Sequence, residues 1–336
     1  MFLLWPELLN STSNSQMFRP KYKICLLFIL HISLVFQLKA QQQPYFSTYF
    51  TNPGIINPSL NSTYENNNVA LIYRSQWTNY APTNLYSSDN SPNTGILSLN
   101  LKSRDKLYSF GFNLISDNLG PKETFIFSPY IAIKKKINNS NLSFSVSPNF
   151  KSSTMNFNSL VFVNPADPFN VGGRQTQSKP DIGLGLSYYN NKILLSIGVD
   201  NITQPSFDFG INDLVNKDLI NISFLGKYLV QIDRDLTLEP FLLVRSDTKS
   251  YTFDMSGMIT YKENMNIGLS YRYDEALVGF LGYSFLKKRK LYVGYSFDYV
   301  LKNVDAKSAT SHELVLRYDL PTPQLKKPIR TPRFIY

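Results

Sequence analysis

Few residues of this sequence have side chains that can act as a nucleophile, a general base or a metal ligand. The chain has one cysteine, Cys25, and two histidines, of which only His312 lies beyond the first 40 residues. A catalytic serine needs a histidine base within hydrogen-bond reach. Ser311 directly precedes His312, but adjacent residues of a strand point to opposite faces, so the pair is poorly placed. We therefore predict that the protein is not an enzyme.

The sequence also has few residues that could bind a metal ion or a phosphate group. One histidine and no cysteine beyond residue 40 exclude the common zinc sets. Asp233, Asp235 and Glu239 lie near a predicted turn, where carboxylates are more often solvated than assembled into a calcium site. Gly183 and Gly185 fall within strand-like runs, where they would let side chains approach across a barrel. The sequence predicts no catalytic, cofactor-binding or metal-binding residue.

The elements that would position any side chain follow a two-residue alternation from about residue 94 to residue 319. In residues 291–299, large apolar or aromatic side chains occupy every second position, and the same pattern occurs in residues 108–112, 142–147 and 182–188. The intervening positions are largely Gly, Ser and Asn, and charges gather in the turns. A soluble sandwich would instead place charged side chains outside. Large side chains outside and small polar ones inside are typical of a closed barrel in lipid.

The bulk composition agrees with such a barrel. Of the 336 residues, 43% are hydrophobic, yet the mean hydropathy of −0.19 is too low for a helical membrane protein. The 24 Phe and 22 Tyr residues are too many for a disordered chain and suffice for the aromatic girdles of a barrel. The formal net charge of +10 includes +3 from residues 1–40 and +4 from residues 320–336. The remainder does not predict nucleic-acid binding.

The N-terminus has the pattern of a secretory leader. Residues 24–38 are apolar but too few to span a bilayer as a helix. Basic residues precede them and the small residue Ala40 follows, so we predict a signal peptide cleaved after Ala40. Because Met17 lies just before this pattern, we interpret residues 1–16 as the product of an upstream start codon. Removal of residues 1–40 leaves a chain without cysteine.

Runs of alternation separated by Asn-rich or Lys-rich turns define about 15 candidate strands. A single-chain outer-membrane barrel has an even number, so we predict an all-β, antiparallel transmembrane barrel of about 14 strands, within roughly 12 to 16. The candidate strands are 69–77, 96–101, 107–115, 124–134, 141–150, 153–163, 181–189, 192–199, 219–230, 235–245, 251–261, 265–273, 277–286, 290–300 and 312–319. The long connections 164–179 and 200–217 are predicted surface loops.

The flanking segments lack this alternation. Residues 41–66 contain Asn-Pro pairs and an Asn-rich run, which predicts a non-strand periplasmic segment before a barrel over residues 67–319. Residues 320–336 form a Pro-rich basic tail, either a frayed terminus or a docking segment for a periplasmic partner. The basic turns 134–136 and 287–290 fit solvated turns at the membrane edge better than lipid-binding sites. If the last strand runs down to the periplasm, the turn 287–290 is periplasmic.

Five short motifs occur in order along the chain, and they resemble those of the PorP/SprF family of type IX secretion system membrane proteins. Residues 46–59 read Phe-Ser-Thr-Tyr-Phe-Thr-Asn-Pro-Gly-Ile-Ile-Asn-Pro-Ser, and residues 73–77 read Tyr-Arg-Ser-Gln-Trp. Residues 81–83 read Ala-Pro-Thr, residues 117–121 Asp-Asn-Leu-Gly-Pro and residues 311–313 Ser-His-Glu. The matching residues are Phe46, Tyr49, Asn52, Pro53, Asn57, Pro58, Tyr73, Arg74, Gln76, Trp77, Pro82, Thr83, Gly120, Pro121, His312 and Glu313.

The resemblance implies a non-enzymatic outer-membrane barrel of the Bacteroidetes envelope. It also implies two kinds of partner: subunits of the type IX machinery, such as its periplasmic ring and lipoprotein components, and a large secreted surface protein such as a gliding adhesin. The barrel would support export or surface tethering of that protein. It would be either a core component or an accessory dedicated to one adhesin, and we favour the second. Residues 160–300 resemble the family only in their general pattern and contain none of its motifs. Ser59 and Ser116 depart from the motifs.

The motif residues also have structural explanations. The two Asn-Pro pairs would shape the N-terminal segment, and Trp77 would anchor the first strand at the membrane interface. Arg74 and Gln76 share a predicted lumenal face, so their hydrogen bonds would hold the segment inside the barrel. We favour such structural roles over direct contact with a partner.

Two other interpretations of the alternation stay open. A porin-like outer-membrane channel or transporter for small solutes would have the same strands, and only the motifs argue against it. A secreted soluble β-protein would instead bury side chains such as Val293 and Phe297 in a protein core.

Overall fold

The structure is a computed structural model that describes residues 45–80, 91–160, 172–209, 216–286, 290–302 and 308–321. The predicted signal peptide, the motif residues Pro82 and Thr83, and the tail beyond residue 321 lie outside these ranges. In the part of the chain that is described, no helix is long and apolar enough to cross a membrane.

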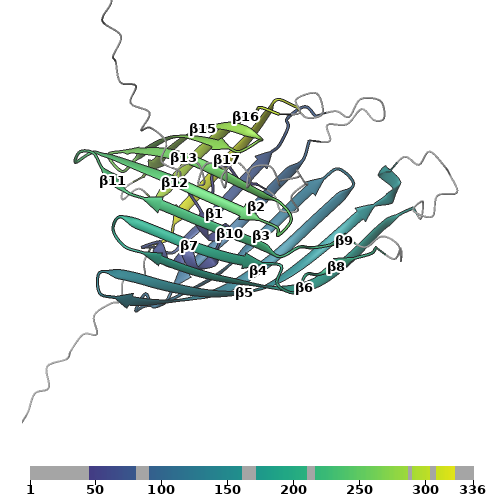
Figure 1. Ribbon diagram of the computed structural model, residues 1–336, viewed down its shortest axis with the longest axis horizontal. Helices are drawn as coiled ribbons and strands as arrows, with labels where there is room; N and C mark the ends of the chain where they lie inside the picture. The colour runs from purple at the N-terminus through teal and green to yellow at the C-terminus, as the bar shows by residue number, and fades with distance from the viewer. Residues whose placement is uncertain are drawn as a thin grey trace, which may run out of the picture. The chain divides into compact units, whose positions relative to one another are not determined.

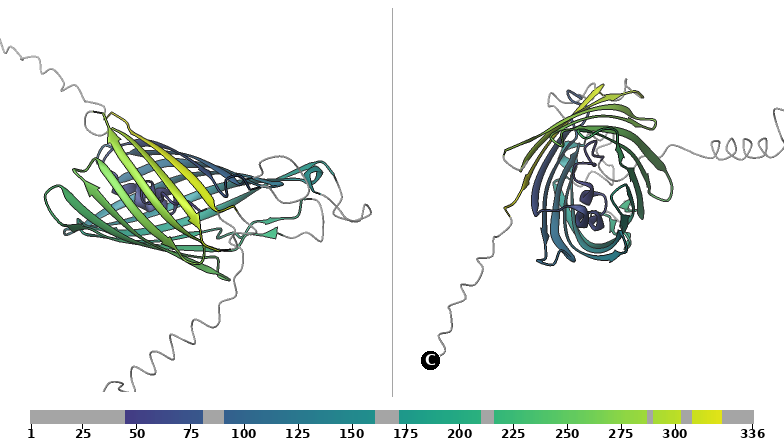
Figure 2. Two further views of the ribbon diagram at one scale, coloured as in Figure 1. Left: turned by 90° about the horizontal axis from the view of Figure 1, so that it is seen from above. Right: turned by 90° about the vertical axis from the view of Figure 1, so that its left-hand side faces the viewer.

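Fourteen antiparallel strands close into a barrel (Figures 1 and 2). They are β1 (Asn68–Ser75), β2 (Asn93–Lys102), β3 (Tyr108–Leu119), β4 (Lys122–Ile137), β5 (Ser140–Asn156), β6 (Arg174–Tyr189), β7 (Ile193–Asp200), β10 (Asn221–Tyr228), β12 (Leu236–Ser246), β13 (Tyr251–Tyr261), β14 (Met265–Arg272), β15 (Ala276–Phe285), β16 (Leu291–Val300) and β17 (Thr310–Asp319). Strands consecutive in this series pair, and the ring closes where β1 pairs with β17. Closure removes the free strand edges that lipid cannot hydrogen-bond.

The described residues also form three shorter strands. The strand β11 (Val230–Gln231) pairs with β12 next to the end of β10. The strands β8 (Ser206–Phe207) and β9 (Asn216–Lys217) pair only with each other, in the connection between β7 and β10.

The predicted fold class, an all-β barrel of about 14 strands, is confirmed, but two boundaries are wrong. The candidate strands 141–150 and 153–163 merge into one strand, β5, because the residues between them continue the ladder to β6. Merging them gives the even number. Strand β5 ends at Asn156, the 3-10 helix η3 (Phe157–Ser159) follows, and residues 161–163 lie outside the described residues. The predicted connection 164–179 is shorter, because residues 174–179 belong to β6. Both errors arise where the strands carry polar side chains on both faces, so the alternation of apolar and polar residues fades.

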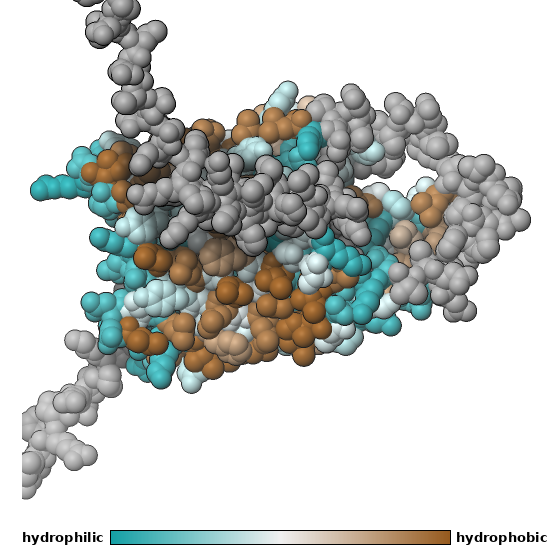
Figure 3. Space-filling model, in the orientation of Figure 1, coloured by the Kyte–Doolittle hydropathy of each residue, from teal (hydrophilic) through white to brown (hydrophobic). Residues whose placement is uncertain are grey.

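The outward-facing side chains of the strands form an apolar belt. Leu269 is 73% exposed, Leu281 54% and Phe297 38%, and Val293 shares the outward face of β16 with Phe297. Figure 3 shows hydrophobic side chains gathered over the middle of the visible strands and hydrophilic surface toward both ends. Because so large an apolar surface is unfavourable in water, this belt is the lipid-facing surface of the barrel.

The two ends of the barrel differ in their connections. At one end β1 begins beside the end of β17, and turns such as 138–139 and 262–264 are short. At the other end connections such as 157–173 and 201–220 are longer. Outer-membrane barrels have short periplasmic turns and long extracellular loops, so we name the two ends periplasmic and extracellular. Strand β15 ends and β16 begins at the end that we name periplasmic, and residues 287–289 of the predicted turn lie outside the described residues.

Residues 45–67, which we call the lumenal segment, run through the inside of the barrel. They contain two 3-10 helices, η1 (Pro53–Ile55) and η2 (Pro58–Thr63), which Figure 2 shows within the ring of strands. The expectation of a non-strand segment agrees with this, but a periplasmic location is wrong for the described residues. The segment carries mainly apolar, hydroxyl and amide side chains, which the barrel wall can both bury and hydrogen-bond.

The inner wall is less polar than the alternation predicts. Ile72, Leu243, Phe280 and Val315 are buried and belong to one core with the lumenal segment. The ring of Phe50 in the segment meets that of Phe280 edge to face, with 4.5 Å between centroids. The barrel therefore contains a small hydrophobic core of its own, and this core fixes the depth at which the segment lies.

Substitution of Leu281 tests the lipid-facing belt. Leu281 lies in the middle of β15 on the outward face, so Leu281→Arg should lower the free energy of unfolding in liposomes by about 2–4 kcal/mol. The matched control Thr176→Arg changes an exposed residue of β6 beyond the belt and should alter it by less than about 0.5 kcal/mol. Urea unfolding followed by fluorescence measures both. A Leu281→Arg barrel as stable as the wild type would contradict lipid contact.

Candidate functional site: the lumenal segment and its charged wall

The start of the lumenal segment is held by one carboxylate. Glu313 on β17 accepts hydrogen bonds from the backbone N–H of Ser47 at 2.8 Å and of Thr48 at 3.1 Å. The Thr48 hydroxyl donates to the same carboxylate. Glu313 points inward because alternate residues of β17 face the lumen, and its neighbour His312 therefore points outward. One side chain thus fixes two consecutive residues of the segment.

Arg74 on β1 links the segment to two carboxylates. Its Nη2 lies 2.8 Å from Oδ2 of Asp298, and its Nη1 lies 3.2 Å from Oε2 of Glu313. The Ser47 hydroxyl donates to Asp298 at 2.7 Å and accepts from Nη1 of Arg74 at 2.9 Å and from Nη2 of Arg272 at 3.0 Å. Strands β16, β17 and β1 are neighbours, so strand pairing brings Asp298, Glu313 and Arg74 together.

The network extends along the wall to β12. The Arg272 guanidinium on β14 lies 3.3 Å from Asp254 and 3.5 Å from Asp298. Arg245 on β12 also pairs with Asp254 at 3.3 Å, and its Cζ lies 4.1 Å from the ring centroid of Tyr45, a cation–π contact with the segment. We call the wall residues Arg74, Arg245, Arg272, Asp254, Asp298 and Glu313 the lumenal charge cluster.

The lumenal charge cluster is buried. Arg74, Arg272 and Glu313 are each 1% exposed. A buried ion without partners loses several kcal/mol of hydration, so each of these charges depends on the others and on added hydrogen bonds. The segment contributes neutral donors and acceptors at Ser47 and Thr48 rather than charge. Removing it would leave carboxylates of the wall with fewer donors, which is a physical reason for the segment to stay in the lumen.

Aromatic side chains of the segment are shielded from water. Burial raises the pKa of Tyr45 to about 12. Burial also raises the pKa of Tyr49, whose hydroxyl lies 2.8 Å from the Ser256 hydroxyl on β13. The Tyr49 ring meets that of Phe241 edge to face at 6.4 Å, and Phe46 belongs to the same buried core. Phe46 and Tyr49, the aromatic residues that match the family in the first motif, therefore anchor the segment.

Asn57 fixes the second half of the segment. Its amide donates to the Ser196 hydroxyl at 2.7 Å and to the Ile197 carbonyl at 2.8 Å, both on β7. Its Oδ1 accepts from the N–H of Ser59 at 3.0 Å and so caps η2. Gly185 on β6 permits this approach, because a Cβ there would lie 1.8 Å from Asn57 Oδ1.

The Asn-Pro pairs shape the segment in the way the sequence suggested. Pro53 opens η1 and Pro58 opens η2, where a missing N–H costs nothing. Asn52 is buried, and its Oδ1 accepts from the Tyr64 hydroxyl at 3.3 Å. Further strands donate to carbonyls of the segment, so that it is held on several sides. These donors are Asn100 on β2, Asn113 on β3, Tyr189 on β6 and Arg317 on β17.

The residues of the second motif divide between the two sides of the wall. Arg74 contacts the segment, as described above, whereas Tyr73 points outward and is 53% exposed. The backbone N–H of Gln76 donates to the Pro92 carbonyl at 2.8 Å, which joins the chain after β1 to the chain before β2. Trp77 lies just beyond β1 at the extracellular end, and its backbone N–H donates to the Ser311 hydroxyl at 3.0 Å.

The other described motif residues lie away from the segment. His312 points outward, with Nδ1 2.6 Å from the Tyr295 hydroxyl, whereas Ser311 is buried on the inward side. The two side chains thus face opposite sides of the wall, which removes the geometry that a serine–histidine pair needs. Gly120 and Pro121 form the tight β3–β4 connection, where Gly120 adopts a φ of +56° that favours glycine.

Sequence reasoning missed most of the lumenal charge cluster. Asp254, Asp298, Arg245 and Arg272 were not singled out, although each occupies an inward position of a predicted strand. An ionisable residue at an inward position of a barrel strand is a signal for such a network, because an unpaired charge there is costly. Their pairing partners, however, lie on different strands and depend on the register, which alternation does not give.

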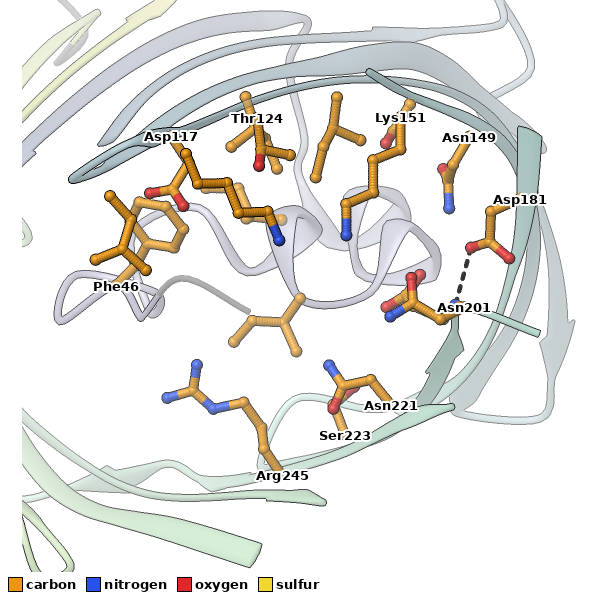
Figure 4. A pocket seen from close by; sticks show the side chains of 18 residues that line it. Phe46, Asp117, Thr124, Asn149, Lys151, Asp181, Asn201, Asn221, Ser223 and Arg245 are labelled. Carbon is orange, nitrogen blue, oxygen red and sulfur yellow. Dashed lines mark hydrogen bonds between the residues drawn. The ribbon is translucent and has the colours of Figure 1, made fainter. Parts of the chain in front are cut away.

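A cavity of about 150 Å³ remains between the segment and the wall (Figure 4). Phe46 borders it on the segment side, and Lys151 points into it from β5 and pairs with Asp218. Asp181 on β6 accepts from the N–H of Asn201 at 2.9 Å. Over the described residues, no three His, Cys, Asp or Glu side chains are grouped as metal ligands. The cavity wall carries charges of both signs and does not define one ligand.

A closed ring of strands, an apolar outer belt and a lumen that holds part of the chain are the features of an outer-membrane β-barrel protein. The model of the family "Type IX secretion system membrane protein PorP/SprF" matches residues 38–318. The chain therefore belongs to the PorP/SprF family, as its motifs indicated. No curated protein matches the sequence.

Several solved outer-membrane proteins are similar to this chain in fold. The toluene transporter TbuX of Ralstonia pickettii superposes with a TM-score of 0.51 at 10% identity, over 80% of this chain and 93% of that one. The toluene transporter TodX of Pseudomonas putida gives 0.46 at 10% identity, over 84% and 98%. Omp33 of Acinetobacter baumannii gives 0.46 at 11% identity, over 76% and 99%. At such identities the likeness concerns the fold alone.

A double-mutant cycle tests the lumenal charge cluster. Arg74→Ala leaves Asp298 and Glu313 buried with one guanidinium fewer and should lower the free energy of unfolding by about 3–5 kcal/mol. Arg74→Ala with Glu313→Ala should cost less than the sum of the single changes, because the side chains interact. Urea unfolding in liposomes measures the free energy of unfolding of each variant. Strictly additive effects of the two changes would contradict an interaction between Arg74 and Glu313. The control Lys106→Ala breaks an exposed pair with Glu65 and should cost less than about 1 kcal/mol.

A steric substitution tests the packing of Asn57 against Gly185. Gly185→Ala places a methyl group against Asn57 Oδ1, and overpacking of about 1–3 kcal/mol should raise hydrogen exchange in the lumenal segment by roughly 5- to 150-fold. In an Asn57→Ala background the same change should have less effect, because the clash with Asn57 is gone and only the Ser145 hydroxyl, a side-chain end 2.5 Å from the added Cβ, must move. The control is Gly257→Ala, where a Cβ would meet nothing within 4 Å. Hydrogen exchange is followed by mass spectrometry. Equal exchange rates of the lumenal segment in Gly185→Ala and Gly257→Ala would contradict close packing of Asn57 against Gly185.

Proposed function

We propose that this protein is a non-enzymatic barrel that supports export or surface tethering of a large secreted protein, such as a gliding adhesin, by the type IX secretion system of a Bacteroidetes cell. Family membership supports the secretion system, and the fold supports the outer membrane. Partners would be the periplasmic ring and lipoprotein subunits of the machinery and the secreted protein itself. In this proposal, signal peptidase cleaves after Ala40 and the barrel is dedicated to one exported protein.

The filled lumen is the observation that favours protein handling over passage of solutes. A diffusion channel needs a continuous aqueous path through the barrel. Here the lumenal segment is hydrogen-bonded to opposite sides of the wall, through Ser47 to β16 and β17 and through Asn57 to β7. Its residues Thr48, Asn57 and Leu60 are fully buried between these sides. A partner protein would then meet the extracellular loops and rim or the periplasmic turns, rather than the lumen.

A porin-like channel is the alternative function. Similarity to transporters such as TbuX concerns the fold and does not choose between the two functions. The decisive difference is whether the wild-type barrel conducts, and whether its loss changes one surface protein or the uptake of solutes.

Deletion of the gene together with bilayer recording tests the proposed function. The deletion strain should lose one large protein from its surface proteome while most outer-membrane proteins remain, and complementation should restore it. The purified wild-type barrel should show no steady conductance in planar bilayers, whereas a variant lacking residues 45–64 should conduct, because the material that fills its lumen is gone. An unchanged surface proteome together with a steady wild-type pore that passes sugars would overturn the proposal and favour the channel.

A further inference from the structure

Strand β6 rises past its neighbour β7 at the extracellular end, and its upper edge has no partner strand. It pairs with β5 along its whole length, from Arg174 to Tyr189. It pairs with β7 only from Leu184 to Tyr189. Long strands of this part of the wall project beyond the rest of the rim in Figure 2. We call residues 174–180 the open edge.

Side-chain contacts show which backbone groups face outward from the open edge. The hydroxyls of Thr154 and Thr176 lie 2.8 Å apart, and those of Ser152 and Ser178 lie 3.1 Å apart. Contacts this close across β5 and β6 are typical of the non-hydrogen-bonded pairs of an antiparallel ladder. The N–H and C=O of Thr176 and Ser178 therefore point away from β5. Pro180 occupies the next equivalent position, which agrees with this parity because proline has no N–H to donate.

Thr176 and Ser178 are exposed, although the connection after β7 reaches this part of β6. There the Thr203 hydroxyl donates to the Pro180 carbonyl at 3.2 Å, and the N–H of Asp208 donates to the Gln177 side chain at 3.1 Å. Within the described residues, neither Thr176 nor Ser178 has a backbone partner on the side away from β5. The last large apolar side chain on the outward face of β5 is Phe150, and the outward residues above it are Ser152 and Thr154. The open edge therefore stands above the apolar belt, where its free donors and acceptors form a template for another strand.

We propose that the open edge binds an extended strand of the exported protein by adding it to the sheet beside β6. This inference rests on the proposed function and assigns a docking site for it. Main-chain hydrogen bonds to Thr176 and Ser178 would supply the affinity. Arg174 is paired with Glu123, and the Asp208 carboxylate accepts from the Gln177 amide, which leaves Lys179 as the one charged residue of 174–180 without an ion pair or hydrogen-bonded carboxylate among the described residues. The site therefore fits an extended segment that is neutral or acidic.

A second copy of this chain fits the open edge less well. Pairing of two such edges would bring a Lys179 from each copy to the same pair of strands, and like charges are unfavourable between neighbouring strands. Pro180 would also lack a donor in both copies. The chemistry of the edge thus favours a strand from another protein.

Proline substitution at the open edge tests this inference. Ser178→Pro removes an N–H that faces away from β5, so the β5–β6 ladder and assembly of the barrel should survive. It should lower the surface amount of the protein that the deletion strain loses by roughly 3- to 10-fold, as expected for one or two lost hydrogen bonds. The matched control Ser178→Ala keeps the N–H and should retain the wild-type amount. Outer-membrane levels of each barrel are measured in parallel.

Photo-crosslinking keeps the inference testable if the proline variant does not assemble. Benzoylphenylalanine in place of Thr176 should crosslink to the exported protein, whereas the same residue in place of Ser152, which is not at the edge, should not. If deletion removes the surface protein but neither Ser178→Pro nor crosslinking at position 176 involves it, the edge inference is wrong and the proposed function stands. If deletion removes no surface protein, the proposed function itself fails. Crosslinks only between copies of this chain would also overturn the inference.

Discussion

Compensation of buried charge is the constraint on which the interior of this protein depends. The wall buries three guanidinium groups and three carboxylates in the lumenal charge cluster, and each needs ionic and hydrogen-bond partners in the absence of water. Arg74 alone does not satisfy Glu313 and Asp298, because both also accept hydrogen bonds from Ser47 or Thr48. A neutral stretch of chain with hydroxyl side chains therefore supplies hydrogen bonds that the buried carboxylates need. Hydrogen bonds to the buried carboxylates of the wall hold the lumenal segment in place, as do its own hydrophobic contacts.

The same strands meet three environments along their length. In the membrane their outward side chains are apolar, inside the barrel they supply either the small core around Leu243 or the lumenal charge cluster, and above the belt both faces become polar. This division separates two tasks. The lumenal segment links opposite sides of the wall inside the barrel, while the rim and the upper part of β6 carry exposed polar residues. Such a division fits the proposed role of a barrel that supports secretion without conducting solutes.

Much of the fold could be predicted from the sequence because one physical rule governs it. Alternation revealed the strands wherever one face meets lipid, and the even number of strands follows from closure. The rule failed in β5 and β6 above the belt, where residues such as Ser152, Thr154 and Thr176 remove the contrast between faces. It also failed for the inner wall, since Ile72 and Val315 point inward to a segment whose position alternation does not encode.

The candidate site could be predicted only in part. Arg74 was linked to the segment because it shares a lumenal face with small residues, and the motif drew attention to Glu313 and Asn57. Arg272 and Asp298 were not recognised as partners, because their meeting depends on the register of β14, β16 and β17 around a closed ring. Gly185 was expected to allow a close approach across the lumen, but the group that approaches, Asn57 Oδ1, is identified only by the structure.

The central claim is that the segment before β1 lies inside the barrel against β7. A disulfide tests it most directly, since the chain without residues 1–40 has no cysteine. A Cβ at Gly198 would lie 3.3 Å from the Cβ of Asn57, close to the spacing of about 3.5–4.5 Å in disulfides. The variant Asn57→Cys with Gly198→Cys, isolated from outer membranes under mild oxidation, should yield one disulfide-linked peptide pair by mass spectrometry. Two free thiols, both open to alkylation in the folded barrel, would contradict the account.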